Sequence, residues 1–183
     1  MEVTVPRFSG KSYLALPTLR GAEVRMHLQL EFRPSSADGL LLYTGEHQQL
    51  IGSHFSLTLR DGYVHFRFNC GSGLAELRSP QPIPLHSWLR LNLSRVENFV
   101  SMQLDGQPSV FRIALGPFRP MRNRLELFLG GSPNTSLVTP RVGTALGFAG
   151  CVRKVTINDK TYDLRGDSHG DAIDGVGIGE RQF

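Results

Sequence analysis

The stretch "SLTLRDGYVHFRFNCGSG", residues 56–73, decides the fold, because it holds two runs of alternating side chains joined at Asp61-Gly62. Alternation with a period of two places the apolar residues of a strand on one face of a sheet. An Asp-Gly pair between two such runs is a strong hairpin signal, since both residues tolerate the positive φ of a tight turn. The stretch therefore predicts an antiparallel hairpin that ends at Cys70. The inward-facing residues of this hairpin include Phe55, which directly precedes the quoted stretch; they are Phe55, Leu57, Leu59, Val64, Phe66 and Phe68.

The same alternation recurs on both sides of this hairpin. Turn signals rich in glycine, aspartate and asparagine separate the runs, and no window of eleven or more residues keeps the 3.6-residue period of a helix. Many short strands with one polar face each predict an all-β fold, an antiparallel β-sandwich. Without a linker or an internal repeat, we expect one domain over residues 1–183. The further runs are residues 24–33, 40–43, 88–94, 99–104, 125–129 and 152–157.

The composition is that of a globular domain with a positive charge. The chain has 183 residues, 40% hydrophobic and 20% charged, and a net charge of +4. No apolar run approaches the about 20 residues that cross a bilayer, so membrane insertion is not expected. A positive charge favours anionic partners where it is clustered. Nothing in the sequence suggests a nucleic-acid partner.

No residue pattern supports catalysis. The six histidines are scattered, without the spacing of a zinc protease, and there is no nucleophile elbow. The glycine-rich stretches at residues 71–73 and 175–179 are interpreted as turns, because neither lies between a strand and a helix with a following lysine. We therefore predict a protein that is not an enzyme.

Two triplets match the sequon for N-linked glycosylation. They are Asn92-Leu93-Ser94, with Asn92 expected on the outward face of a strand, and Asn134-Thr135-Ser136, in a polar loop. The triplet is common by chance, so each is only a candidate acceptor and a weak pointer to secretion.

Six ordered blocks together resemble one family. In their order and spacing they make the chain similar to laminin G-like domains, of the type found in agrin, perlecan, pikachurin and eyes-shut proteins. The resemblance covers about residues 8–179. It implies a jelly-roll sandwich that is secreted to the extracellular matrix and binds glycans and cell-surface proteins through loops at one rim. The blocks are "FSGKSYLALP" (8–17), "DGLLLYTGE" (38–46), residues 55–79, "WLRLNLSR" (88–95), "LELFLGGSP" (125–133) and "FAGCVRKVTINDK" (148–160).

Many members of this family hold a calcium ion at the rim, and the resemblance shows where its ligands would fall here. The first aspartate falls on Ser53, a backbone carbonyl on Cys70, and the second aspartate within Arg122-Asn123-Arg124. A gap of one residue in this alignment would bring Glu46 or Asp61 nearer to the site. Calcium takes about six to eight oxygen ligands, and its affinity depends on how many are charged. Since both carboxylates are replaced, we expect no calcium and no other cofactor.

Arginine supplies most of the 20 basic residues. Guanidinium groups match sulfate and carboxylate in a bidentate way, so an arginine cluster could bind heparan sulfate or another acidic glycan, including one carried by a cell-surface glycoprotein such as dystroglycan. The predicted glycan-binding residues are Arg119, Arg122 and Arg124, with Asn69 and Ser53 as hydrogen-bonding neighbours.

Two other interpretations stay open. Arginines at outward strand positions or strand ends could instead form a solvated face paired with glutamates; Arg60, Arg67, Arg90 and Arg95 are assigned to such positions. Alternatively, the domain is a calcium-independent protein-binding module that uses the exposed rim apolars Phe118, Pro120 and Met121.

Cys70 and Cys151 are the only cysteines. The resemblance implies that Cys151 pairs with a cysteine near the end of the domain, but no partner follows it in this sequence. A Cys70–Cys151 bridge would join the rim to a strand that the family does not place beside it. We therefore favour two unpaired thiols.

Overall fold

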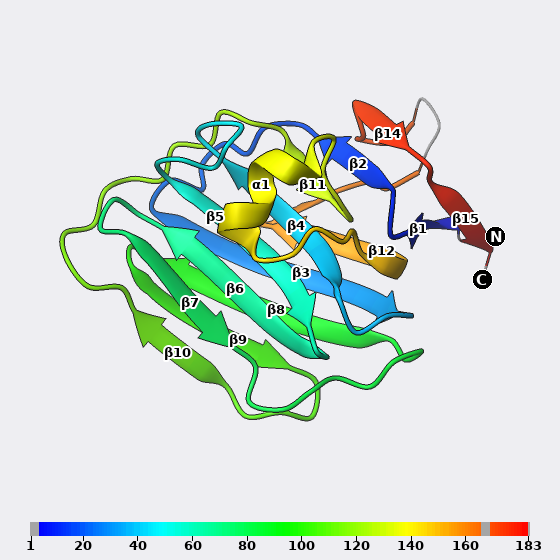
Figure 1. Cartoon of the computed structure of the whole chain (residues 1–183), viewed down its shortest axis with the longest axis horizontal. Coiled ribbons are helices and arrows are strands. Elements are labelled where there is room, and N and C mark those ends of the chain that lie inside the picture. The colour runs from blue at the N-terminus through cyan, green and yellow to red at the C-terminus, as the bar shows by residue number, and fades with distance from the viewer. Residues whose placement is uncertain (1–3, 166–168, 183) are drawn as a thin grey trace.

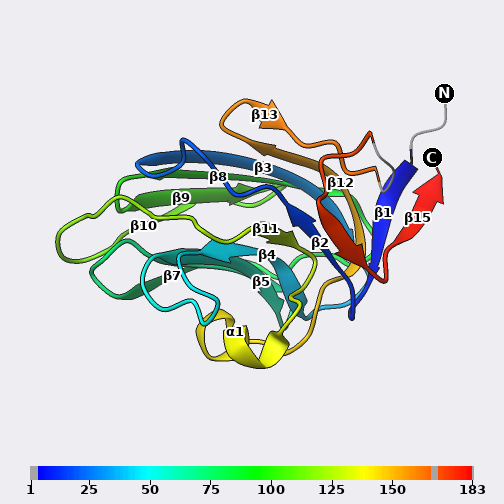
Figure 2. The same cartoon turned by 90° about the horizontal axis from the view of Figure 1, so that it is seen from above.

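Two antiparallel sheets lie face to face and form the sandwich that the alternating runs predict (Figures 1 and 2). The computed structural model describes residues 4–165 and 169–182. Sheet A has the order β10-β9-β8-β3-β12-β1-β15, with β13 paired to β12, and sheet B has the order β14-β2-β11-β4-β5-β6-β7.

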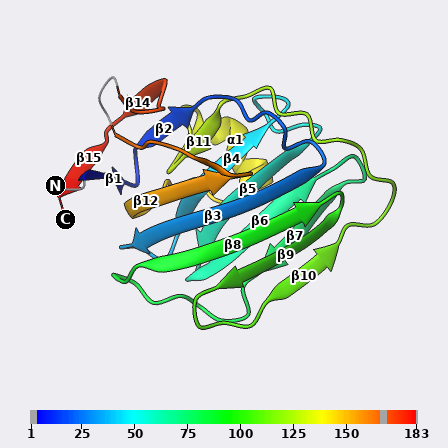
Figure 3. The ribbon, with the colours of Figure 1, turned by 180° about the vertical axis from the view of Figure 1, so that it is seen from behind.

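The strands of sheet A are β1 (Thr4–Ser9), β3 (Arg25–Pro34), β8 (Leu89–Val96), β9 (Phe99–Leu104), β10 (Val110–Ile113), β12 (Ala149–Ile157), β13 (Lys160–Thr161) and β15 (Gly179–Gln182). Those of sheet B are β2 (Tyr13–Leu16), β4 (Gly39–Gly45), β5 (His54–Arg60), β6 (Tyr63–Asn69), β7 (Leu74–Arg78), β11 (Leu127–Leu129) and β14 (Asp174–Val176). Figure 3 shows sheet A from its outer side, with β12, β3, β8, β9 and β10 in sequence across it.

The hairpin predicted at Asp61-Gly62 is confirmed. β5 and β6 pair antiparallel from His54 opposite Asn69 to Arg60 opposite Tyr63. Asp61 and Gly62 have φ angles of 51° and 80°, as the two-residue turn requires. The inward side chains of this hairpin meet the alternating apolar residues of β3 in one core, which closes the sandwich.

One short helix lies on the outer face of sheet B, where the sequence predicted only a loop. α1 (Thr135–Val142) begins after Asn134 and buries Val138 and Val142 against sheet B (Figures 1 and 2). Because α1 covers part of β5, His54, Ser56 and Thr58 are buried even though they point away from the sandwich core. β5 therefore lacks the polar, solvated face expected of it.

Both cysteines are buried and lie in different sheets, Cys70 directly after β6 and Cys151 in β12. Burial raises the pKa of the Cys70 thiol, although the nearby Arg95 guanidinium acts in the opposite direction. We expect no reaction of the folded protein with a thiol reagent in the absence of reductant, and two equivalents of thiol after denaturation. Recovery of no thiol from the denatured protein would contradict this and would show a bridge.

Candidate functional site

One irregular segment, residues 114–126, links β10 to β11 and crosses the loops at one end of the sandwich; it is called the rim segment below. Backbone hydrogen bonds fix its course. The N–H of Ala114 donates to the carbonyl of Asn98, that of Arg119 to Cys70, that of Met121 to Glu23 and that of Arg124 to Gly45, all at 2.8–2.9 Å. The rim segment is thus tied to four separate parts of the chain, which sets the positions of its arginines.

The turn that follows the β5–β6 hairpin positions Arg119. Its backbone N–H donates to the Cys70 carbonyl at 2.8 Å. Its aliphatic stem lies against Gly71, where an added Cβ would come within 2.9 Å of the Arg119 Cγ and Cδ. Gly71 also has a φ of 103°, so glycine is needed there both for the turn and for the close approach of Arg119.

Arg122 is held by Ser53, the residue at the family's first aspartate position. The Ser53 hydroxyl accepts a hydrogen bond from the Arg122 N–H at 2.8 Å and donates one to the Arg122 carbonyl at 3.2 Å. The Ser53 hydroxyl, at a position that the resemblance aligns with a carboxylate, therefore fixes the backbone of Arg122.

Ser53, Arg119 and Arg122 line one cavity of about 370 Å³, together with Glu46 and Pro120. All three arginines of the rim segment are exposed, and none of their guanidinium groups forms an ion pair with any residue in the described ranges. Arg124 is not among the cavity-lining residues.

Two other site residues lie differently from the expectation. Asn69 does not line the cavity, and its side-chain oxygen accepts the Gly71 N–H within the turn. Glu46, which was not among the predicted site residues, does line the cavity. The sequence indicated it only through a one-residue gap in the alignment with the family's calcium positions. Asp61 lies at the opposite end of β5, in the hairpin turn.

The residues that the resemblance aligns with the family's calcium positions offer few free oxygen ligands. The Ser53 hydroxyl and the Cys70 carbonyl already bond to the backbone of the rim segment. The buried Oδ1 of Asn123 is the one calcium-position oxygen without a partner in the described chain. Glu46 supplies a single carboxylate, and two guanidinium groups line the same cavity. No cluster of three or more acidic, histidine or cysteine side chains occurs among the described residues.

Arg95 is not on the outer surface, which corrects the expectation from residue type. Its side chain is 0% exposed and points inward from β8, beneath the rim. It donates to the carbonyls of Ala22 at 2.6 Å and Glu97 at 2.9 Å, and it lies 3.9 Å from the Cys70 sulfur. Burial lowers the pKa of Arg95. This guanidinium joins three chain segments that underlie the rim segment.

The other arginines assigned to outward positions form ion pairs, as the solvated-face interpretation expects. Arg60 and Arg67 contact Glu76 at 3.0 and 2.7 Å. On sheet A, Arg90 contacts Glu31 at 3.4 Å. Each of these arginines has a carboxylate partner, which Arg60 and Arg67 share, in contrast to those of the rim segment.

Two buried histidines on sheet B make the stability depend on pH. Burial lowers the pKa of His54 and of His65, despite a 2.6 Å contact from His65 Nδ1 to Glu76. A lowered pKa means that the unfolded chain takes up protons first, so the free energy of unfolding falls as pH falls below about 6.5. We expect a loss of up to about 1.4 kcal/mol per pH unit for each histidine in urea unfolding between about pH 7 and pH 5.

The variant His65→Gln should flatten this pH profile. Glu76 contributes separately at lower pH. Burial raises its pKa, but hydrogen bonds from His65 and Arg67 outweigh burial and lower it, so its contribution is lost only in acid below its ordinary range. An unfolding free energy that does not change between pH 7 and pH 5 would contradict the assignment of both histidines.

The apolar residues assigned to protein binding are mostly covered. Met121 is fully buried and Phe118 is half-buried against the core, because the rim segment folds back onto the sandwich. Pro120 alone is exposed, at the edge of the arginine cavity. The apolar rim surface expected from these three residues is therefore absent.

The two sequons occupy different settings. Asn92 lies on the outer face of β8, as predicted, in the middle of sheet A. Asn134 precedes α1, and the Ser136 hydroxyl donates to its side-chain oxygen at 2.9 Å.

Comparison with known proteins points to one family. The model of the laminin G domain matches residues 32–160. Rat pikachurin is 35% identical over 178 residues, which is 97% of this chain and 18% of pikachurin. The mouse basement membrane-specific heparan sulfate proteoglycan core protein is 36% identical over 90% of this chain and 4% of its own length. The chain thus spans less than a fifth of these curated relatives.

Solved structures agree on the fold. Domains LG4-5 of the mouse laminin α1 chain superpose with a TM-score of 0.84 and 22% identity, covering 97% of this chain and 46% of that chain. No helix in the described part of the chain is long and apolar enough to span a membrane.

Proposed function

This chain belongs to the laminin G domain family, and from that premise we propose that it is an extracellular binding module that recognises sulfated or otherwise acidic glycans without calcium. The proposed contacts are the guanidinium groups of Arg119, Arg122 and Arg124. Heparan sulfate, or an acidic glycan on a cell-surface glycoprotein, is the proposed class of ligand.

One observation carries this proposal. The hydroxyl of Ser53 and the carbonyl of Cys70, at positions that the family uses for calcium, here hold the backbone of Arg122 and Arg119. This supports the proposal that exposed guanidinium groups, without an ion pair to any described residue, act at this rim in place of the family's cation. A guanidinium donates two parallel hydrogen bonds to a sulfate or carboxylate, which gives geometric selectivity as well as attraction.

Glu46 should set the balance of charge in the cavity. Glu46 lines the cavity beside Arg119 and Arg122, and its carboxylate lies 3.9 Å from Nε2 of His47. With two arginines and one carboxylate, the lining of the cavity keeps a net charge of about +1, so a monovalent anion would gain only part of the attraction of the rim segment. A polyanion that also reaches Arg124 would gain the full attraction of the rim segment, so the proposed ligand is a sulfated chain rather than a single acidic sugar.

Secretion and glycosylation form part of the same proposal. Relatives include a basement-membrane proteoglycan core protein, which supports a place in the extracellular matrix. Of the two sequons, Asn134 is the favoured glycan acceptor. It is exposed just before α1, and its side-chain oxygen already accepts a hydrogen bond from the Ser136 hydroxyl.

Calcium should leave the stability of the domain unchanged. A ligand that binds the folded state raises the free energy of unfolding by RT ln(1 + [L]/Kd), or about 2.7 kcal/mol at a hundred times Kd. Since the donor set has one carboxylate, we expect the same melting temperature in millimolar calcium and in EDTA. A rise of several degrees in calcium would contradict the assignment of Ser53 and Asn123.

Retention on heparin in EDTA tests the proposed function itself. We expect the domain to bind immobilised heparin at low salt and to elute as salt is raised, because salt screens exposed charges. A domain that passes through at low salt contradicts the proposal.

A protein-binding role is the second candidate, and one observation favours it. Leu115, at the start of the rim segment, is 86% exposed. Binding through such apolar contacts would be insensitive to salt, which separates it from the glycan proposal.

A further inference from the structure

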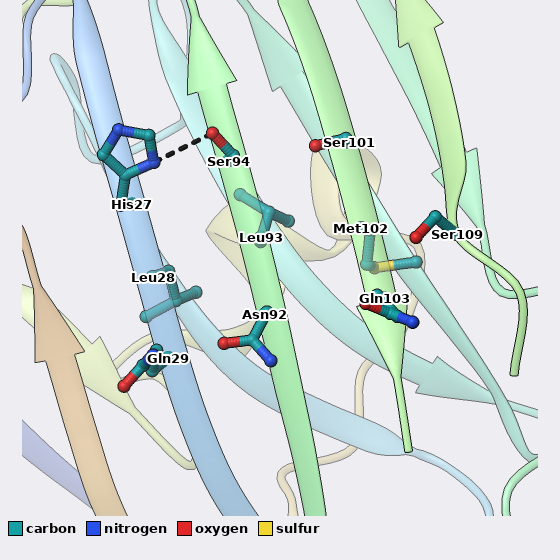
Figure 4. Close-up of a pocket in the computed structure, with 10 residues that line it drawn as sticks. All are labelled: His27, Leu28, Gln29, Asn92, Leu93, Ser94, Ser101, Met102, Gln103 and Ser109. Carbon is teal, nitrogen blue, oxygen red and sulfur yellow. Dashed lines mark hydrogen bonds between the residues drawn. The ribbon is translucent and has the colours of Figure 1, made fainter. Parts of the chain in front are cut away.

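The outer face of sheet A carries a second candidate site, away from the rim. A cavity of about 290 Å³ lies over β3, β8 and β9 (Figure 4). Its size is close to the lower end of about 300 Å³ for small-ligand pockets. Every polar side chain that lines it is an amide, a hydroxyl or the imidazole of His27, and no carboxylate, lysine or arginine lines it. A site of this composition suits an uncharged polar ligand.

Three carboxamides stand side by side across this face. Gln29 on β3 is directly opposite Asn92 on β8, and Asn92 is directly opposite Gln103 on β9. Residues paired in this way have Cβ atoms about 5 Å apart on one face of the sheet. All three are exposed, and none of these side-chain amides is hydrogen-bonded to another group in the described chain. The row offers three NH2 groups as donors and three carbonyl oxygens as acceptors to a ligand.

A second row runs parallel to the first and ends on an aromatic surface. His27 is opposite Ser94 and is hydrogen-bonded to its hydroxyl at 2.8 Å, Ser94 is opposite Ser101, and Ser101 is opposite Phe111 on β10. Phe111 is 70% exposed and stacks on Phe99, which is 41% exposed, with ring centroids 6.1 Å apart. Two aromatic rings so exposed on one face mark an interaction surface rather than ordinary packing.

We propose that this face binds an uncharged oligosaccharide, with its hydroxyls on the carboxamide row and the apolar face of one sugar ring on Phe111. A planar carboxamide has a donor and an acceptor at the spacing of two neighbouring hydroxyls, and an aromatic ring packs on the C–H groups of a sugar. The site does not depend on the rim arginines. It therefore stands or falls separately from the proposed acidic-glycan function.

A glycan attached to Asn92 and a ligand bound in this groove would exclude each other. Asn92 is the central residue of the carboxamide row, so a glycan attached there would cover the groove. The proposed site therefore requires that Asn92 stays unmodified in the secreted protein, whereas Asn134 lies near α1, on the other sheet.

The test is a titration of the ¹⁵N-labelled domain, made without glycosylation, with chitohexaose, cellohexaose and mannohexaose at millimolar concentration. We expect at least one of these neutral probes to shift the side-chain amide resonances of Gln29, Asn92 and Gln103. The double variant Gln29→Ala, Gln103→Ala should bind that probe roughly tenfold more weakly, and Phe111→Ala about fivefold more weakly, because each removes exposed ligand contacts. The matched control Arg119→Ala, Arg122→Ala should bind it as the parent does.

Four results would overturn the site. They are no shift with any of the three probes, binding that survives both sets of substitutions, a glycan found at Asn92 in protein secreted from animal cells, and self-association of the domain that Phe111→Ala abolishes. The last result would assign the aromatic surface to a second copy of the chain. Failure of the heparin test leaves each of these outcomes unaffected, so the two proposals can fail separately.

Discussion

Replacing Arg95 with alanine should lower the free energy of unfolding by about 3 kcal/mol. The substitution leaves the buried carbonyl of Ala22 and the partly buried carbonyl of Glu97 without this donor, and it opens a cavity beneath the rim. An unsatisfied buried acceptor costs about 1–3 kcal/mol, and the cavity adds to that cost. Relief of the buried charge offsets part of the loss, since burial of a guanidinium is itself unfavourable.

Two further variants, measured by urea unfolding at neutral pH, separate the cost of the unpaired carbonyls from the effects of the lost volume and the lost charge. Arg95→Met keeps most of the volume, so the loss that remains, about 1–2 kcal/mol, reports the orphaned carbonyls. Arg90→Ala, on the outer face of the same strand, removes the same charge and should cost less than about 1 kcal/mol. If Arg95→Ala is as stable as the parent, the desolvation of Arg95 outweighs its hydrogen bonds and the structural role assigned to it is wrong.

The double variant Arg119→Ala, Arg122→Ala should bind heparin roughly 30-fold more weakly than the parent at low salt. Both guanidinium groups line the rim cavity without an ion pair to any described residue, so their full charge is available to a sulfated chain. A charge-assisted hydrogen bond contributes about 1.5–3 kcal/mol before screening, and exposure reduces that value. Both residues are exposed, and the fold should tolerate their removal.

The matched control is Arg90→Ala, Arg153→Ala, which removes the same two charges from the outer face of sheet A. Both of these arginines contact Glu31 at 3.4 Å, so its carboxylate offsets part of their charge, and they lie away from the rim segment. We expect this control to elute from heparin close to the parent. If the rim double variant and this control elute at the same salt concentration, retention on heparin depends on net charge alone and the rim segment is not the heparin-binding site.

The strands with strict alternation could be predicted from the sequence. The runs at 54–60 and 63–68 match β5 and β6 to within one residue, because apolar side chains at every second position meet the core of a sandwich in only one register. α1 and the short strand β10 could not be predicted. Their residues show weak periodicity, and their positions depend on contacts with distant strands.

Arg95 shows how residue type can mislead where periodicity does not. The alternation that places Leu89, Leu91 and Leu93 inward places residue 95 inward as well. The rule that arginine lies at the surface suggested the opposite, and it failed because the guanidinium group finds backbone carbonyls at Ala22 and Glu97. The Ala22 carbonyl comes from a part of the chain distant in sequence, so no local pattern indicates it.

The site was predicted in part. Ser53, Arg119 and Arg122 lie together, as the resemblance implied, because the loops at this end of the sandwich hold the rim segment by its backbone. Asn69 and Arg124 are outside the cavity and Glu46 is inside it. Side-chain direction in an irregular segment is set by individual hydrogen bonds, which sequence spacing does not reveal.

The central claim is that the guanidinium groups of the rim segment bind acidic glycans, and its most direct test is the salt dependence of heparin affinity in EDTA. The logarithm of Kd should rise linearly with the logarithm of the sodium chloride concentration, with a slope that reflects the number of paired charges. We predict measurable binding by the parent in EDTA, and a slope lower by roughly 1 to 2 in the Arg119→Ala, Arg122→Ala variant. A parent that binds only when calcium is added, or a variant with the parent's slope and affinity, would contradict the account.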